Sequence, residues 1–175
     1  MPGAQKYIGN ADGVAKAPRA GMDEFIRLCV QYSGGVLWNN GSYGVRDMRG
    51  KPKSLSVHAT GRAVDMSWRF MPNHRDASNS KGIPKGRQPA RRFINTLTRN
   101  ANLFGLQLVI DYWPKEHGAA WRCDRQSWYR YQKHTVSGAP KSDWFHIELN
   151  PIMADNPQFV RAAFIQVFGK STTNP

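Results

Sequence analysis

The sequence predicts a single α+β domain, built from a small antiparallel sheet flanked by helices. Its length of 175 residues is that of one ordinary domain, and 40% of the residues are hydrophobic, which is enough to fill a core. Segments with helical spacing and segments typical of strands follow one another in the order helix, strands, helix, strands, helix. We expect a polar leader over residues 1–20, the folded domain over 21–170 and a tail over 171–175.

Three segments have the apolar spacing of packed helices. Residues 22–32 carry apolar side chains at helical spacing and acidic side chains near the start, where the helix dipole favours them. A second helix is predicted over 89–104, with Pro89 in its first turn and Gly105 just after its end. The chain closes with a helix near 157–168.

Short strands are predicted between these helices. Residues 33–53 are rich in Gly and Asn, which indicates turns between short strands. Residues 55–68 are interpreted as a loop that enters a strand, and the runs over 106–113 and 144–149 as further strands. Residues 69–89 are polar and interrupted by Pro and Gly, so a long surface loop is expected there.

The charge of the chain indicates the sign of its partner. The net charge is +13, from 25 Lys and Arg against 12 Asp and Glu, so the protein should be attracted to polyanions. Nucleic acid and an anionic cell wall are both candidates. The sequence has no helix-turn-helix, zinc-finger spacing or RNA-recognition signature, and no long run of basic residues, so specific nucleic-acid binding is not expected.

The cysteines and the first twenty residues indicate in which cellular compartment the protein is made. Cys29 and Cys123 lie outside any metal-binding spacing, and both are interpreted as buried or partly buried thiols whose redox state stays open. The first twenty residues contain no apolar run typical of a signal peptide or a membrane span. Synthesis in a cytosol and no transmembrane segment are therefore expected.

Three residues have the chemistry of a hydrolytic metal site on the sheet. Two neutral His nitrogens and one carboxylate oxygen leave the fourth position of a tetrahedral zinc ion open for water, and His58, Asp65 and His146 supply this set. By spacing alone, they are more readily explained as two ordinary histidines and a carboxylate at the end of a strand.

The residues around these three resemble a known signature. The segment SVHATGRAVD, residues 56–65, matches the pattern SxHxxGxAxD at all five specified positions, and Asp143 stands three residues before His146, as in DxxH. Both patterns, in this order, resemble those of the M15 group of zinc peptidases, which includes D-alanyl-D-alanine carboxypeptidases and VanY-like enzymes and shares its centre with lysostaphin and the hedgehog domain. The resemblance covers roughly residues 33–150.

The resemblance implies a role for each matching residue. His58, Asp65 and His146 would bind one zinc ion, and Asp143 would be the general base that takes a proton from the attacking water and passes it to the leaving amine. Family members also place an Arg before the first zinc His to hold the substrate carbonyl or carboxylate, and Arg46 is our choice over Arg49. Where the carboxypeptidase branch has a His two residues before the acidic base, this chain has Lys141, which puts that contribution in doubt.

Several neighbouring residues have two interpretations. Asp143 alternatively caps a turn after Pro140. Glu148 shares a strand face with His146 and either orients its imidazole or pairs with an Arg. The aromatic residues of the aperiodic segment 113–141 either form a platform for sugar rings or peptide stems or belong to the core with Arg stacked on them; they are Trp113, Trp121, Trp128, Tyr129 and Tyr131.

The resemblance implies a peptidoglycan peptidase that cuts an amide in the stem peptide or crosslink. Together with the expected cytosolic synthesis, it favours a phage endolysin or virion-associated lysin, present in the host cytoplasm before release to the cell wall, or in the virion. We expect a monomer, or a protein docked in a virion. The alternative is a catalytically silent component of a phage particle that zinc stabilises and that binds the wall.

Overall fold

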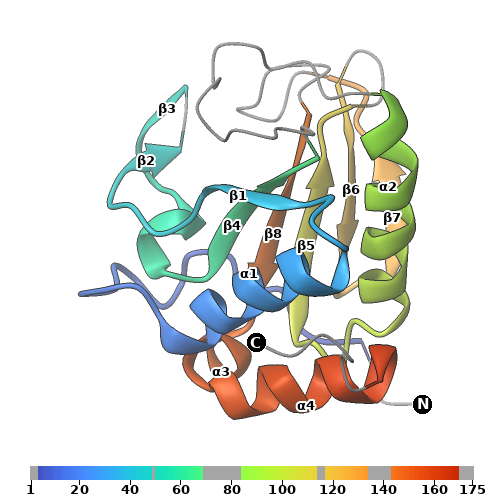
Figure 1. The fold of residues 1–175 in the computed structure, drawn as a ribbon. Coiled ribbons are helices and arrows are strands. Elements are labelled where there is room, and N and C mark those ends of the chain that lie inside the picture. The colour runs from blue at the N-terminus through green and yellow to red at the C-terminus, as the bar shows by residue number, and fades with distance from the viewer. Residues whose placement is uncertain (1–3, 49, 69–83, 114–116, 134–142, 170–175) are drawn as a thin grey trace.

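The structure, a computed structural model, confirms the α+β class. It describes residues 4–48, 50–68, 84–113, 117–133 and 143–169. In chain order the elements are α1 (Ala20–Tyr32), β1 (Trp38–Gly41), β2 (Asp47–Met48), β3 (Lys51–Leu55), the short 3-10 helix η1 (Val57–Thr60), β4 (Ala63–Ser67), α2 (Pro84–Arg99), β5 (Leu106–Asp111), β6 (Ala119–Arg122), β7 (Ser127–Arg130), β8 (Trp144–Leu149), α3 (Pro151–Asp155) and α4 (Pro157–Phe168) (Figure 1).

One antiparallel sheet organises the domain. Its six strands lie in the order β1-β4-β8-β5-β6-β7, and β2 and β3 form a separate two-stranded sheet. The central strand β8 pairs with β4 on one side and with β5 on the other, although all three are far apart in the sequence. In the β4–β8 ladder, Asp65 stands directly opposite His146.

The two faces of the sheet have different coverings. On one face the apolar side chains of β8, Phe145, Ile147 and Leu149, are completely buried, and they belong to a core that α1, α2 and α4 complete. Figure 1 shows α1 and α2 against the sheet and α4 across its lower end. The other face of β8 carries His146 and Glu148, as the strand alternation predicts.

The N-terminal segment, residues 4–19, fastens to the sheet through a buried Arg. Arg62, just before β4, is completely buried; its guanidinium donates to both carboxylate oxygens of Asp12 at 2.8 Å and to the carbonyl of Leu149 at 2.6 Å. It also donates to the carbonyl of Gly9. Because a buried guanidinium needs acceptors, this segment is part of the folded domain although it has no regular secondary structure.

The predicted helix over 89–104 is shifted in the structure. α2 begins at Pro84 and ends at Arg99, so the predicted loop over 69–89 is wrong for residues 84–89, and residues 69–83 lie outside the described residues. A Cβ on Gly86 would lie 2.6 Å from the backbone oxygen of Trp68. This Gly therefore permits close helix packing and does not mark a loop. Gly105 follows a turn after α2 and does not end the helix.

The other predicted helices agree closely with α1 and α4, and Cys29 and Cys123 are both buried free thiols, as predicted. The sequence prediction missed the hairpin of β6 and β7 and the short α3. Strand β7 is an outer strand with mostly exposed side chains, so it lacks the alternation that reveals a half-buried strand. The tail over 171–175 lies outside the described residues, and none of the described helices is long and apolar enough to cross a membrane.

The pair of buried Arg62 and partly exposed Asp12 should dominate the attachment of the N-terminal segment. Burial alone would raise the pKa of Asp12, but Arg62 lowers it below the usual 3.8. Asp12→Asn should reduce the free energy of unfolding at pH 7 by about 2 kcal/mol, because it leaves the buried guanidinium of Arg62 without its charged acceptor. Urea denaturation measures this change.

The same variant has a defined pH dependence. Only the ionised carboxylate provides the stabilisation, so the gap to wild type should be complete above pH 3.8 and shrink as the pH falls through the lowered pKa of Asp12. Asp155→Asn is the control, because Asp155 pairs with Arg19 but is more than half exposed and should change stability little. Equal effects of the two variants at pH 7 would contradict the role of the pair of Arg62 and Asp12.

Candidate metal centre

The matched signature residues around His58 form a compact turn. Ser56 caps η1, and its hydroxyl accepts a hydrogen bond from the backbone N–H of His58 at 3.3 Å. Gly61 ends the turn with φ of 72°, a conformation that favours Gly, and a Cβ there would meet Cγ of Arg19 at 3.0 Å. Ser56 and Gly61 thus have structural roles that fix the position of His58.

One ring nitrogen of His58 is committed to the backbone. His58 Nδ1 lies 2.7 Å from the carbonyl oxygen of Ser42, in the loop after β1. Because a carbonyl only accepts, Nδ1 carries a proton and the neutral ring presents the lone pair of Nε2. Nε2 faces Asp65 Oδ1 at 3.5 Å. No sequence signal pointed to Ser42, since its contribution is a backbone oxygen.

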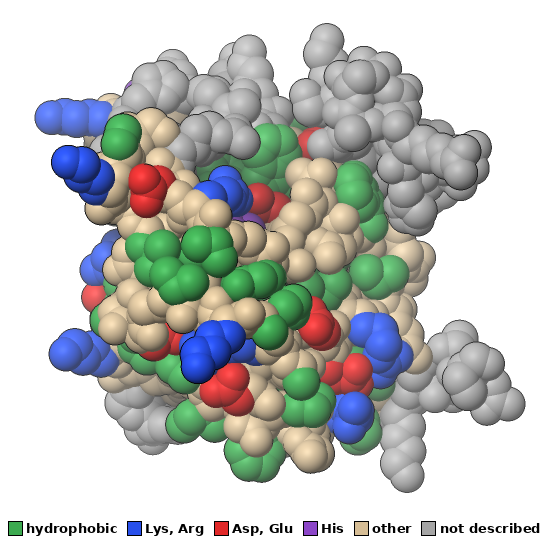
Figure 2. All heavy atoms as spheres, turned by 90° about the vertical axis from the view of Figure 1, so that its left-hand side faces the viewer, with side chains coloured by type: hydrophobic (Ala, Val, Ile, Leu, Met, Phe, Trp, Pro, Cys, Tyr) green, Lys and Arg blue, Asp and Glu red, His purple; other side chains and the backbone are tan. Residues whose placement is uncertain are grey.

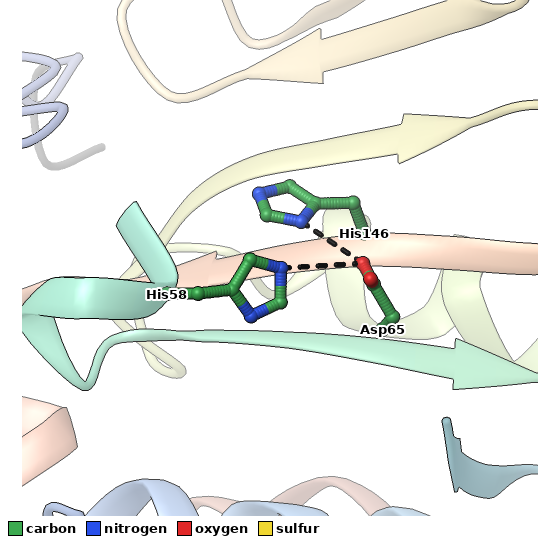
Figure 3. A group of neighbouring side chains, drawn as sticks. All are labelled: His58, Asp65 and His146. Atoms are coloured by element: carbon green, nitrogen blue, oxygen red, sulfur yellow. Dashed lines mark hydrogen bonds and ion pairs between the residues drawn. The ribbon is translucent and has the colours of Figure 1, made fainter. Parts of the chain in front are cut away.

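Asp65 and His146 meet across the β4–β8 ladder. His146 Nδ1 lies 3.1 Å from Asp65 Oδ1, and the rings of His58 and His146 have centroids 5.0 Å apart (Figure 3). Donor atoms of the three residues all lie within 4.8 Å of one another. We call these three residues the His-Asp-His triad. The structure therefore brings together all three predicted ligands in an arrangement that could hold a metal ion.

Two of the three donor distances agree with a small ion. A zinc ion with bonds of about 2.0 Å holds neighbouring ligand atoms roughly 3.3 Å apart. The distances from Asp65 Oδ1 to His146 Nδ1 and to His58 Nε2 are 3.1 and 3.5 Å, and all three donors lie within 4.8 Å of one another. Two His and one carboxylate are a donor set that a divalent metal ion accepts.

The electrostatics of the triad favour a cation. Burial alone would raise the pKa of Asp65, but hydrogen bonds from His146 and His58 lower it far below its usual value. Burial alone would lower the pKa of His146, but the carboxylates of Asp65 and Glu148 raise it to about 10. The site thus stabilises positive charge between buried carboxylates, which a proton or a metal ion can supply.

Glu148 contacts the outer side of His146. Its Oε1 lies 3.0 Å from His146 Nε2, on the side of the ring away from Asp65. Of the two interpretations made for Glu148, orientation of the imidazole agrees with this contact, and no Arg among the described residues forms an ion pair with its carboxylate. A carboxylate in this position is the usual partner of a metal-binding His.

Asp143 lies immediately before β8, next to the end of β4. Its backbone carbonyl accepts hydrogen bonds from the N–H of Trp68 at 3.0 Å and from the hydroxyl of Ser67 at 2.9 Å. The residue is completely buried. The structure therefore fixes its backbone three residues before His146, and its role as general base stays a prediction.

Arg46 lies between β1 and β2 with an exposed side chain. Its carbonyl accepts a hydrogen bond from the N–H of Ser56 at 3.0 Å, which ties its backbone to the turn that carries His58. Its guanidinium makes no ion pair or hydrogen bond within the described part of the chain, so it is not among the residues brought together at the triad. Arg49 and Lys141 lie outside the described residues.

The aromatic residues before β8 mainly extend the core. Trp121 is buried, and the guanidinium of Arg91 lies over the ring of Trp128 at 4.0 Å, which agrees with core aromatics stacked with Arg. Both rings border a groove of about 920 Å³ between α2 and the β6–β7 hairpin. Trp121 stands opposite Val109 of the core face, so this groove lies on the other side of the sheet from the triad.

Of the triad, His58 and His146 are buried and the Asp65 side chain is 19% exposed. On the side of β2 and β3, a small area of His atoms is visible beneath an acidic and a basic side chain (Figure 2).

Comparisons of the chain with models of protein families, with characterised proteins and with solved structures found no match. The functional argument therefore depends on the residues themselves.

Metal binding by the triad is directly measurable. Wild type should bind one zinc ion per chain, and His58→Ala should weaken binding by more than the roughly 10–100-fold that loss of a ligand's hydrogen-bond partner costs. Dialysis followed by elemental analysis gives the stoichiometry. His117→Ala, which changes a His outside the triad, is the matched control and should bind zinc as wild type does.

Proposed function

We propose that this chain is a zinc-dependent peptidase that hydrolyses an amide bond in the stem peptide or crosslink of bacterial peptidoglycan. The observation that carries the proposal is the agreement between the signature and the geometry. The sequence patterns that resemble those of M15 peptidases mark His58, Asp65 and His146 as ligands. His58 and His146 are 88 positions apart in the sequence, yet the donor atoms of the three residues lie within 4.8 Å of one another. The sequence patterns and the distances between donor atoms thus point independently to the same three side chains.

The chain's own residues have defined tasks in this proposal. Zinc, when bound, supplies Lewis acidity that makes water a nucleophile near neutral pH. Asp143 accepts the proton of the attacking water and delivers it to the leaving amine. Arg46 holds the substrate carbonyl oxygen or a terminal carboxylate from the exposed loop before β2. His58 and His146 stay neutral as ligands, with their outer nitrogens on Ser42 and Glu148.

Charge supports a cell-wall substrate. The net charge of +13 favours an anionic surface, which bacterial walls present. We further propose a phage origin, as an endolysin or a virion-associated lysin that acts after release from the host cytoplasm or from the virion. The protein would act as a monomer or docked in a particle.

One alternative has a specific observation in its favour. The side chain of Arg46 is exposed and forms no hydrogen bond or ion pair with the three triad residues, and Asp143 is completely buried. These placements would suit a catalytically silent component of a phage particle, in which zinc stabilises the fold and the basic surface binds the wall. Hydrolysis of purified peptidoglycan separates the two functions.

Asp143→Asn should separate metal binding from hydrolysis. The variant should retain one zinc ion, because Asp143 is outside the triad, and should lose about 100-fold or more in rate, because a general base typically contributes that much. Release of soluble muropeptides from purified walls measures the rate, and mass spectrometry identifies the bond. Asp124→Asn, an exposed Asp in the β6–β7 turn, is the control and should hydrolyse at the wild-type rate.

The outcomes are distinguishable. Hydrolysis at the wild-type rate by Asp143→Asn would remove it from the mechanism while leaving the metal centre intact. Zinc-loaded wild type that releases no fragments from walls of several peptidoglycan types would refute the peptidase and support the silent component.

A further inference from the structure

We propose that Tyr7, in the N-terminal segment, is a positioning residue of the metal centre. Its hydroxyl holds Glu148, and Glu148 in turn holds His146 in the orientation that presents Nδ1 to Asp65. The proposal rests on the metal centre of the proposed function and adds a residue outside the region that resembles M15 peptidases.

A continuous series of contacts joins Tyr7 to the triad. The Tyr7 hydroxyl donates to Glu148 Oε2 at 3.1 Å, Glu148 Oε1 faces His146 Nε2 at 3.0 Å, and His146 Nδ1 faces Asp65 Oδ1 at 3.1 Å. Each carboxylate oxygen of Glu148 therefore has its own donor. The imidazole lies between two carboxylates, and Nε2–H is committed to Glu148 while Nδ1 is the nitrogen available to a metal ion.

Within the described part of the chain, Glu148 has few other sources of a hydrogen bond. It is 2% exposed, and its neighbours across the two adjoining strands are Ala63 on β4 and Leu108 on β5. Neither side chain can donate. Among the described residues, the side-chain hydrogen bonds to the carboxylate come from His146, on its own strand, and from Tyr7. A buried carboxylate that loses one of two donors is destabilised and free to rotate away from its remaining partner.

Tyr7 is itself held in place. The N–H of Ile8 donates to Oε1 of Gln107 on β5 at 2.8 Å, and the guanidinium of Arg122 lies 5.0 Å from the centre of the Tyr7 ring. Arg62 donates to the carbonyl of Gly9. Burial and the neighbouring Glu148 raise the pKa of Tyr7, so its hydroxyl remains a donor at neutral pH. The segment thus presents a preorganised donor to Glu148.

The Ala of the signature gains a physical explanation from this contact. Ala63 stands directly opposite Glu148 in the β4–β8 ladder and is completely buried. Side chains opposite each other on one sheet face are about 5 Å apart at Cβ, so a larger residue at position 63 would compete with Glu148 for space. A small residue there leaves room for the series from Tyr7 to His146.

The test removes one hydroxyl. Tyr7→Phe keeps the ring and should weaken zinc binding about 10–100-fold, measured by competition with a chelator. In the same variant, ¹⁵N NMR of the imidazole should show a changed Nε2 resonance for His146 in both zinc-loaded and metal-free protein. Tyr32→Phe is the matched control: the Tyr32 hydroxyl donates to the Gly169 carbonyl at 2.9 Å, so this variant also removes one tyrosine hydroxyl but leaves Glu148 and the partners of His58 unchanged. It should bind zinc as wild type does.

A double variant tests whether Tyr7 acts through Glu148. In a Glu148→Gln background, Tyr7→Phe should weaken zinc binding much less than it does alone, because the group that it positions has already changed. Wild-type zinc affinity in Tyr7→Phe, or an equal loss in Tyr32→Phe, would overturn the proposal. If wild type binds no zinc, the metal centre fails, and an unchanged His146 Nε2 resonance in metal-free Tyr7→Phe would then overturn the positioning role separately.

Discussion

The pairing of β4 with β8 is the constraint on which the candidate centre depends. It places Asp65 opposite His146, and the same register places Ala63 opposite Glu148 and Val64 opposite Ile147. A slip of one residue would turn His146 and Glu148 toward the helices and Ile147 toward the opposite face. The completely buried apolar side chains of β8 oppose this slip, so the hydrophobic core fixes the geometry of the polar site.

Two buried charged side chains depend on partners from outside the sheet as well as from within it. Arg62 donates to Asp12 of the N-terminal segment and to Leu149 of β8, and Glu148 accepts from Tyr7 of that segment and contacts His146 of β8. The segment lacks helix or strand, yet it satisfies two buried charged groups of opposite sign. The attachment of the N-terminal segment is therefore linked to the orientation of the metal ligand His146 through the hydrogen bond from Tyr7 to Glu148.

The features visible in the sequence were local ones. The signature over residues 56–65 and the strand alternation around His146 depend on neighbours in the chain, and the structure brings the three predicted ligands together. The helices over Ala20–Tyr32 and Pro157–Phe168 were recognisable for the same reason, because apolar spacing is a local pattern. Helix α2 was misplaced at its start because Gly86 and Pro89 are loop signals, whereas here close packing against Trp68 requires the Gly.

Long-range contacts were beyond a sequence prediction. The Tyr7 hydroxyl meets a carboxylate 141 residues away, and the oxygen that holds His58 belongs to the backbone of Ser42, which any residue could supply. Such contacts leave no pattern in a single chain. Glu148 was an intermediate case: alternation placed it on the face of His146, but only the structure showed which partner it contacts.

A metal centre with acidic side chains can exist in a strongly basic protein because several of its acidic side chains are buried. Of the 12 Asp and Glu residues, Glu24, Asp111, Asp143 and Glu148 are buried, while the chain as a whole carries a net charge of +13. Charges on the surface are screened over about 8 Å at physiological salt, whereas Asp65 acts on His146 over 3.1 Å in a buried setting. The short-range attraction of the triad for a cation can therefore coexist with a long-range attraction of the whole molecule for an anionic wall.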